Sequence, residues 1–173
     1  FELDENQIKI NPGISGIGEP EVRGVALDSD QAQVSVRGVP DKPGTAAALC
    51  SALAEAGISL DTIVQSERQQ TNGSRDISFT LKRKDRNQAG MALGPLLAKW
   101  PGAQLEDGPA ITRISAVGAG MPATPGTAAR MFRALADAKI NIAMITTSEI
   151  RTSCIVGKSE GLAALKAVHK HFG

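Results

Sequence analysis

The order of apolar and polar residues predicts a chain in which strands and helices alternate. Several stretches alternate apolar and polar residues, as half-buried strands do, whereas others carry apolar residues three and four positions apart, as one face of a helix does. The first pattern predicts strands over residues 22–27, 33–39, 58–66, 76–82, 103–105, 111–118, 140–148 and 150–156. The second predicts helices over residues 45–56, 87–100, 126–138 and 159–171. Residues 33–105 thus follow the order βαββαβ, and residues 111–171 repeat it without a last strand.

The two halves share the same turn between their first strand and first helix. The residues Pro43-Gly44-Thr45-Ala46-Ala47 return 82 positions further along as Pro125-Gly126-Thr127-Ala128-Ala129. This spacing is longer than a solenoid repeat and has the size of a small domain. Unpaired backbone N–H groups and the positive end of a helix dipole gather at such a turn, where they suit a carboxylate or a phosphate. We therefore expect the function at these two turns.

The alternation predicts an α+β protein of two domains, each with a four-stranded antiparallel sheet and both helices on one face. Residues 1–21 contain Pro and Gly with little periodicity and are interpreted as a linker or arm. Residues 22–32 hold a spare strand that should complete the second sheet, while residues 33–109 form the first domain and residues 110–173 the second. The first domain is then an insertion within the second. Exposed sheet faces and edges favour pairing with another copy of the chain.

Composition limits the kind of core and the kind of partner. Of 173 residues, 42% are hydrophobic but only 3% are aromatic, so the core must consist of Ala, Val, Ile and Leu. In the predicted helix over 87–100, the inward residues are expected to be Met91, Leu96, Leu97 and Trp100. The net charge is +1 with scattered Lys and Arg, which argues against a nucleic-acid partner.

The N-terminus and the cysteines point to the cytoplasm. No apolar run approaches the roughly 20 residues that span a bilayer, so no membrane partner is expected. Residues 1–5 are acidic and lack the features of a signal peptide. Cys50 and Cys154 are interpreted as buried free thiols in a reducing compartment. The chain does not begin with Met, which is typical of a fragment of a longer protein.

The sequence contains no motif that predicts an enzyme, so no catalytic residue, metal or cofactor is expected. Residues 118–123 match a dinucleotide-binding pattern, but Pro122 and Pro125 delay the following helix and a ferredoxin-like unit lacks the doubly wound sheet that the motif needs. Neither a Walker loop nor a serine elbow is present. His169 and His171 lie well apart around their helix, which favours a surface role over a metal pair.

The two copies of the repeat differ in their acidic residues. Asp41 corresponds to Ala123, and Asp61 corresponds to Ala143, so only the first copy carries acids near its turn and second strand. A helix N-terminus binds an anion and a nearby carboxylate binds a cation, and a free α-amino acid carries both charges a few ångströms apart. Two other roles remain equally open. Asp41 would be a helix N-cap, and Asp61 a solvated acid at a strand end.

These same residues resemble the regulatory region of aspartate kinases. Residues 39–44, 57–61, 64–66 and 76–80 look like the first ACT domain of that family, and residues 117–121, 125–126, 141–142 and 147–150 look like the second. The resemblance covers about residues 22–172 and is strongest for the subclass whose β subunit is the regulatory half alone. None of the motifs of the family's kinase domain is visible.

The resemblance implies a ferredoxin-like βαββαβ fold for each repeat and a homodimer in which the ACT domains of two chains join their sheets. It implies that the chain is not catalytic by itself, that it works with an aspartate kinase catalytic domain, and that lysine and threonine bind between ACT domains. By position, the first repeat contributes Asp41, Lys42, Pro43, Gly44, Thr45, Ala46, Ser59, Leu60, Asp61 and Gln65 to the effector site. The second repeat contributes Met121, Asn141, Ile142, Thr147 and Glu149. The family usually has Asn in place of Ser59.

Two further interpretations stay open. The chain would be an assembly module that holds kinase chains together and binds effectors weakly or not at all. Alternatively, it would be an ACT sensor attached to another enzyme of amino-acid metabolism.

Overall fold

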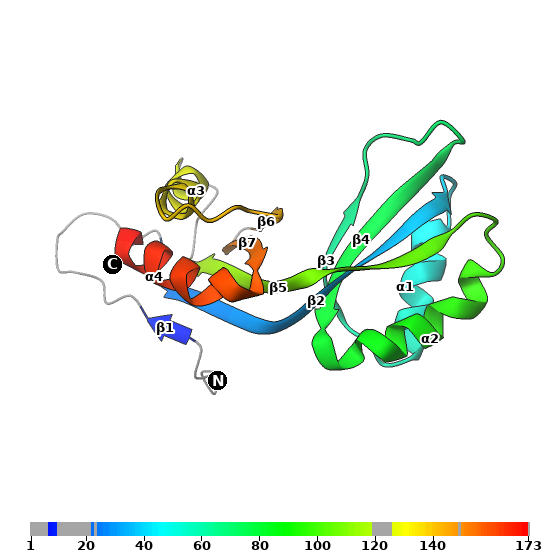
Figure 1. Ribbon diagram of the computed structural model, residues 1–173, viewed down its shortest axis with the longest axis horizontal. Coiled ribbons are helices and arrows are strands. Elements are labelled where there is room, and N and C mark those ends of the chain that lie inside the picture. The colour runs from blue at the N-terminus through cyan, green and yellow to red at the C-terminus, as the bar shows by residue number, and fades with distance from the viewer. Residues whose placement is uncertain (1–6, 10–21, 23, 119–125, 149, 173) are drawn as a thin grey trace. The chain divides into compact units, whose positions relative to one another are not determined.

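The computed structural model describes residues 7–9, 22, 24–118, 126–148 and 150–172. The chain divides into two compact units (Figure 1). The first unit consists of residues 30–110, and the second consists of residues 1–29 together with 111–173. Each is described by itself below. The exact domain boundaries inferred from the sequence, at residues 21/22, 32/33 and 109/110, stay a prediction.

The first unit has the order βαββαβ. Its elements are the end of β2 (Gly24–Pro40), α1 (Thr45–Glu55), β3 (Leu60–Gln65), β4 (Ser74–Lys82), the 3-10 turn η1 (Arg83–Asp85), α2 (Arg86–Leu97) and the start of β5 (Gln104–Val117). The strand order is β3-β4-β2-β5, and β4 is antiparallel to both β2 and β3. The register sets Val34 opposite Phe79, and these side chains pack with Leu49 of α1 and Leu93 of α2 in one core. Both helices therefore cover the same face of the sheet.

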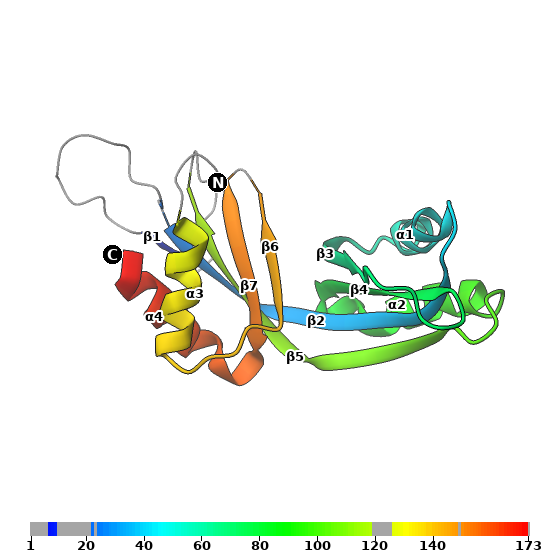
Figure 2. The same cartoon turned by 90° about the horizontal axis from the view of Figure 1, so that it is seen from above.

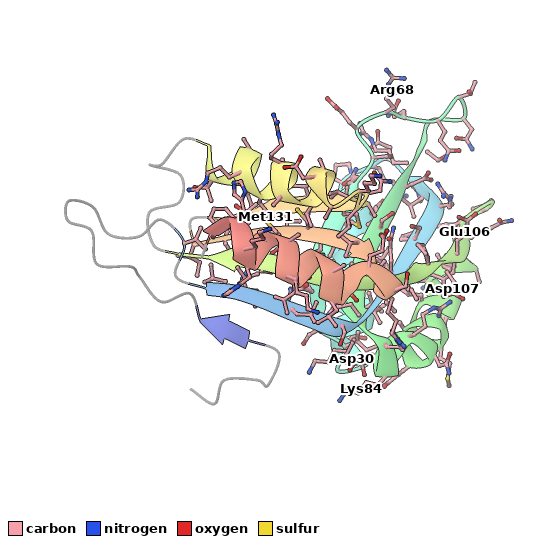
Figure 3. The ribbon with its side chains drawn as sticks, turned by 60° about the vertical axis from the view of Figure 1, so that its left-hand side comes forward. Asp30, Arg68, Lys84, Glu106, Asp107 and Met131 are labelled. Atoms are coloured by element: carbon pink, nitrogen blue, oxygen red, sulfur yellow. The ribbon has the colours of Figure 1, made fainter. Side chains whose placement is uncertain are left out.

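The second unit repeats this arrangement with a strand taken from the start of the chain. It contains the end of β5, α3 (Thr127–Asp137), β6 (Met144–Thr147), β7 (Arg151–Gly157), the 3-10 turn η3 (Lys158–Glu160) and α4 (Gly161–Phe172), in the strand order β2-β5-β7-β6. Helices α3 and α4 lie on the same face of this sheet (Figure 2). The core joins Val25 of β2 and Ile114 of β5 to Met131 of α3, which is labelled in Figure 3. The predicted α+β class is thus confirmed, as is the prediction that the N-terminal strand completes the second sheet.

Two pairs of predicted strands are each one continuous strand. The strands expected over 22–27 and 33–39 form β2, and those expected over 103–105 and 111–118 form β5. The polar residues between them continue the strand in each case. β2 and β5 lie side by side, so the backbone groups of these polar segments find partners in a ladder while side chains such as Asp30, Glu106 and Asp107 stay exposed (Figure 3).

Two smaller features differ from the prediction. Within residues 1–21, expected to be a linker or arm, the short strand β1 (Gln7–Lys9) pairs antiparallel with residues 24–26 of β2. In α2, Met91 is 79% exposed, so its expected place in the core is wrong. Ala89 and Leu93 are the buried residues of that helix, and Met91 lies two positions from each, on the opposite side of a helix with 3.6 residues per turn.

Candidate functional site

The turn between β2 and α1 leaves the start of the helix without a side-chain cap. Gly44 is the N-cap residue and has a φ of 91°, a left-handed conformation that favours glycine, and the described residues supply no side-chain cap to α1. Gly126 occupies the same place before α3 with a φ of 99°. The N–H of Thr45 donates to the carbonyl of Lys42 at 3.3 Å, and no side chain caps the other N–H groups in the first turn of either helix. The N-cap role considered for Asp41 is wrong.

Asp41 instead contacts Gln69 in the loop between β3 and β4 and Arg75 at the start of β4. Its Oδ1 lies 2.9 Å from Nε of Arg75, and its Oδ2 accepts a hydrogen bond from Nε2 of Gln69. The hydrogen bond from Gln69 and then the adjacent guanidinium of Arg75 hold the pKa of the Asp41 carboxyl below its ordinary value. Asp41 is therefore a carboxylate at neutral pH, and a protein cation lies against it.

Arg75 also connects this carboxylate to the loop of residues 66–73. Its Nη1 donates to the carbonyl oxygens of Ser66 at 2.9 Å and Glu67 at 2.8 Å. This loop turns at residues 71–74, with Gly73 at a φ of 77° and with Oδ1 of Asn72 accepting a hydrogen bond from the backbone N–H of Ser74 at 3.1 Å. Arg68 projects from the outer part of this loop (Figure 3). Neither Gln69 nor Arg75 was identified from the sequence.

Thr45 places a buried hydroxyl at the start of α1. The residue is only 6% exposed, and its Oγ1 has no hydrogen-bond partner among the residues that the structure describes. A hydroxyl that is buried without a partner costs free energy, unless a bound group satisfies it. Thr45, the helix N-terminus and Asp41 together offer donors to an anion and a carboxylate to a cation.

The other predicted residues of the first unit lie at two different ends of the sheet. Gln65 is opposite Ile77, near the end of β4 that starts at Ser74, and Ser74 is opposite Pro40 just before the turn. Leu60 is opposite Leu81, seven residues along β4, which corresponds to roughly 24 Å of strand. Gln65 is therefore on the side of the turn, whereas Ser59, Leu60 and Asp61 are at the far end.

The second unit shows the same separation. Thr147 is opposite Thr152, close to the end of β5 that leads to the turn before α3. Asn141 and Ile142 precede β6 at the opposite end, where Asn141 is exposed and Ile142 packs against the core. The predicted residues Met121 and Glu149 lie outside the described residues. One copy of a unit thus does not bring its turn and the start of its second strand together.

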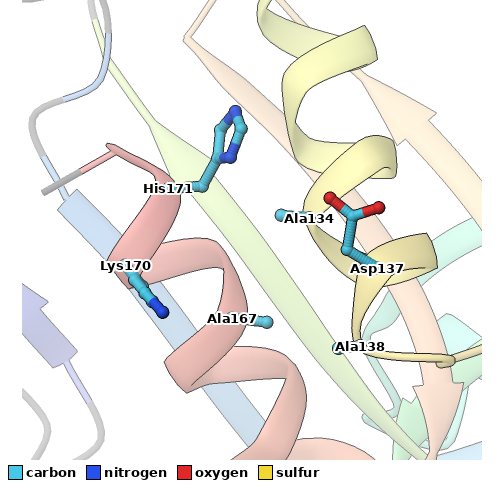
Figure 4. A pocket seen from close by; sticks show the side chains of 6 residues that line it. All are labelled: Ala134, Asp137, Ala138, Ala167, Lys170 and His171. Carbon is cyan, nitrogen blue, oxygen red and sulfur yellow. The ribbon is translucent and has the colours of Figure 1, made fainter.

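A groove of about 390 Å³ lies elsewhere, between α3 and α4 of the second unit (Figure 4). It is lined by Ala134, Asp137, Ala138, Ala167, Lys170 and His171. None of the predicted site residues lines it. The described residues contain no group of three His, Cys, Asp or Glu side chains placed to hold a metal ion. Among the described helices, none is both long enough and apolar enough to cross a membrane.

Comparisons with known proteins match both units to one domain type and most of the chain to one kind of protein. Models of the ACT domain match residues 32–93 and residues 114–172. An aspartokinase from Thermus thermophilus is 43% identical over 151 residues, which are 87% of this chain and 37% of that protein. The chain therefore spans about 37% of the length of the curated relatives it matches.

Two solved structures extend this similarity to three dimensions. The ligand-free regulatory subunit of aspartate kinase from Thermus thermophilus is 42% identical with a TM-score of 0.82, and the match covers 88% of this chain and 99% of that one. The aspartate kinase from Synechocystis is 49% identical with a TM-score of 0.82, and the match covers 94% of this chain and 28% of that one.

Proposed function

Because the chain belongs to the family of aspartate kinase regulatory subunits, built from tandem ACT domains, we propose that it binds the end-product amino acids L-lysine, L-threonine or both. The observation that carries this proposal is the ionised carboxylate of Asp41 beside the uncapped N-terminus of α1. The unpartnered hydroxyl of Thr45 lies at the same helix end. Three separate groups thus favour a ligand with both a positive and a negative charge.

Each charge of an amino acid has a counterpart at this turn. The α-carboxylate accepts hydrogen bonds from the first N–H groups of α1, where the helix dipole favours an anion. The α-ammonium pairs with Asp41 in a charge-assisted hydrogen bond. The second repeat has the same Pro-Gly-Thr-Ala-Ala sequence with Ala123 in place of the acid, so the first repeat is the one that binds the zwitterion.

A second copy of the chain completes the site. Within one unit the turn and the residues at the start of the second strand lie at opposite ends of the sheet, so these residues serve a turn that belongs to another copy. The edge strands β3 and β6 expose Ile63 and Ile145, an apolar surface that suits sheet-to-sheet pairing. The proposed effector-binding residues are Asp41, Lys42, Pro43, Gly44, Thr45, Ala46, Ser59, Leu60, Asp61, Gln65, Met121, Asn141, Ile142, Thr147 and Glu149.

Binding at such an interface regulates the catalytic part of an aspartate kinase in the cytoplasm. A ligand shifts an equilibrium only through its different affinity for two states. An amino acid held between two copies favours the arrangement in which these copies are clamped together. Feedback inhibition follows if the attached kinase is inactive in that arrangement. This chain then needs no catalytic group or cofactor of its own.

Calorimetric titration of the 173-residue chain tests the proposal. L-lysine and L-threonine are added singly and together, and we expect saturable heat from at least one of these titrations. Asp41→Asn should remove most of it, whereas Asp28→Asn, which breaks the ion pair with Arg113 in the second unit, should leave it unchanged. Absence of heat in all three titrations with the unaltered chain would rule the sensor function out.

The second candidate function is that of an assembly module. It is favoured by the exposed apolar residues on both edge strands and by the fact that Arg75 already neutralises Asp41. Sedimentation with and without the amino acids separates the two functions. A dimer whose dissociation constant does not change with either amino acid favours the assembly module.

A further inference from the structure

Arg75 contacts the carboxylate that the proposed function assigns to the α-ammonium of an amino acid. Its Nε is 2.9 Å from Oδ1 of Asp41. The side chains of both residues are mostly shielded from solvent, with exposed fractions of 26% and 21%. A cation of the protein therefore occupies the cationic half of the site in the structure described here.

Arg75 has other partners to which it can remain bound. Its Nη1 donates to the carbonyl oxygens of Ser66 and Glu67, and both belong to the loop that precedes β4 rather than to the turn. A ligand ammonium could thus replace Nε at Asp41 while the rest of the guanidinium stays hydrogen-bonded. The ion pair with Asp41 is the contact that connects Arg75 to the turn.

The internal duplication shows that the acid and the arginine occur together. In the first unit, the backbone N–H of Ser66 donates to the carbonyl of Asp76, and in the second unit that of Ser148 donates to the carbonyl of Arg151. Asp76 therefore corresponds to Arg151, and the preceding residues, Arg75 and Ile150, correspond to each other. The repeat that carries Asp41 therefore has Arg75, and the repeat with Ala123 has an exposed Ile in its place. The charged pair is a property of the ligand-binding repeat alone.

We propose that Arg75 is an internal competitor of the effector, a residue that lowers effector affinity by pairing with Asp41 until a ligand ammonium displaces it. This inference rests on the proposed function and adds to it. Displacement breaks the ion pair between the turn and the loop of residues 66–73, so effector binding and the position of this loop become coupled. Arg75 acts on the ligand through Asp41 and is in this sense a positioning residue.

The test compares dissociation constants measured by calorimetry for L-lysine and L-threonine on the 173-residue chain. Arg75→Gln removes the charge and shortens the side chain, and should tighten binding by about two- to fivefold, the range expected for a partly exposed ion pair. Arg75→Lys keeps the charge and should restore the affinity of the unaltered chain. Arg113→Gln, which loses the ion pair with Asp28 in the second unit, should change neither constant.

The outcomes distinguish this inference from the function on which it rests. Unaltered affinity or weaker binding in Arg75→Gln, while the unaltered chain binds, overturns the competitor role and leaves the sensor function intact. Heat from neither amino acid in either chain overturns both. Heat that appears only in Arg75→Gln supports the competitor role. Arg75→Ile, which copies the second repeat, is the neutral variant to use if Arg75→Gln does not fold.

Discussion

The carboxylate of Asp76 accepts a hydrogen bond from the backbone N–H of Gly38 at 3.0 Å, where β2 changes register against β4. Gly38 has a φ of 72°, and a Cβ there would lie 3.0 Å from the carbonyl oxygen of Gly102. The same carboxylate accepts a hydrogen bond from Gln70 at 2.7 Å. Asp76 therefore connects the end of β2 with the loop before β4.

Asp76→Ala is expected to lower the free energy of unfolding by about 1–3 kcal/mol, because it leaves the N–H of Gly38 and the amide of Gln70 without their acceptor. Denaturant unfolding measures the loss. The matched control is Asp107→Ala, which removes an acid paired with Arg86 at a far more exposed position and should have little effect. Equal losses in the two variants would contradict the role given to Asp76.

Local sequence signals were sufficient for the helices and for the class of fold. Helix α1 begins at Thr45, as predicted, and α3, predicted from residue 126, begins one residue later at Thr127, because the turn and the Ala/Leu pattern are local features. The continuity of β2 and β5 was missed, since exposed polar residues in a strand are recognisable only when the distant partner strand is known. Met91 was misplaced because an apolar residue alone does not reveal the phase of a helix.

The candidate site was predictable only in part. The turn at residues 41–46 is formed as expected, and the assignment of effector residues stays a prediction. The pair formed by Asp41 and Arg75 joins residues 34 positions apart, and no local pattern indicates such a contact. The separation of Asp61 from Asp41 follows from the topology. A strand that follows a crossing helix starts at the opposite end of the sheet from the turn before that helix.

The edge strands should carry the contact between two copies. Ile63 of β3 pairs with Phe79 of β4 and is 52% exposed. Ile145 of β6 pairs with Cys154 of β7 and is 48% exposed. Lysine on an edge strand blocks strand pairing, so Ile63→Lys and Ile145→Lys should each raise the dimer dissociation constant about tenfold or more. Sedimentation at several concentrations measures this constant. Met91→Lys changes an exposed apolar residue on α2 and should leave it unaltered, and equal effects at all three sites would exclude the edges.

The two thiols should differ in reactivity. Burial raises the pKa of the Cys154 thiol from 9.0 to about 12, whereas Cys50 is only half-buried. At pH 8 a thiol reagent should modify one cysteine in the native chain and two in the unfolded chain. Mass spectrometry of the modified peptides identifies the residue, and rapid native labelling of Cys154 would show that its burial has been misjudged.

The same shift predicts how stability changes at high pH. Above pH 9 the thiol of Cys154 ionises in the unfolded chain but stays protonated in the folded one, so the folded state binds more protons and stability falls as the pH rises. The slope is about 1.4 kcal/mol per pH unit up to about pH 12. Cys154→Ala should show a shallower decrease than the unaltered chain in denaturant unfolding between pH 9 and 10.5, and parallel curves would argue against the shift.

Gly161, the first residue of α4, is close to the β-branched side chain of Thr112 in β5. A Cβ at residue 161 would lie 2.8 Å from Cγ2 of Thr112, which is fully buried and has no room to move away. Gly161→Ala should therefore lower the free energy of unfolding by about 1–3 kcal/mol, the usual result of overpacking. Apart from its chain neighbours and the backbone of its own helix, Gly94 in α2 has no atom within 4 Å of the same added carbon. Gly94→Ala should leave the free energy of unfolding nearly unchanged, because the helix preference of alanine is opposed by the ring of Pro95, which disfavours a side chain on the preceding helical residue. A loss at Gly161 alone would show that α4 is packed tightly on β5, and no loss at Gly161 would mean that this contact is looser than described.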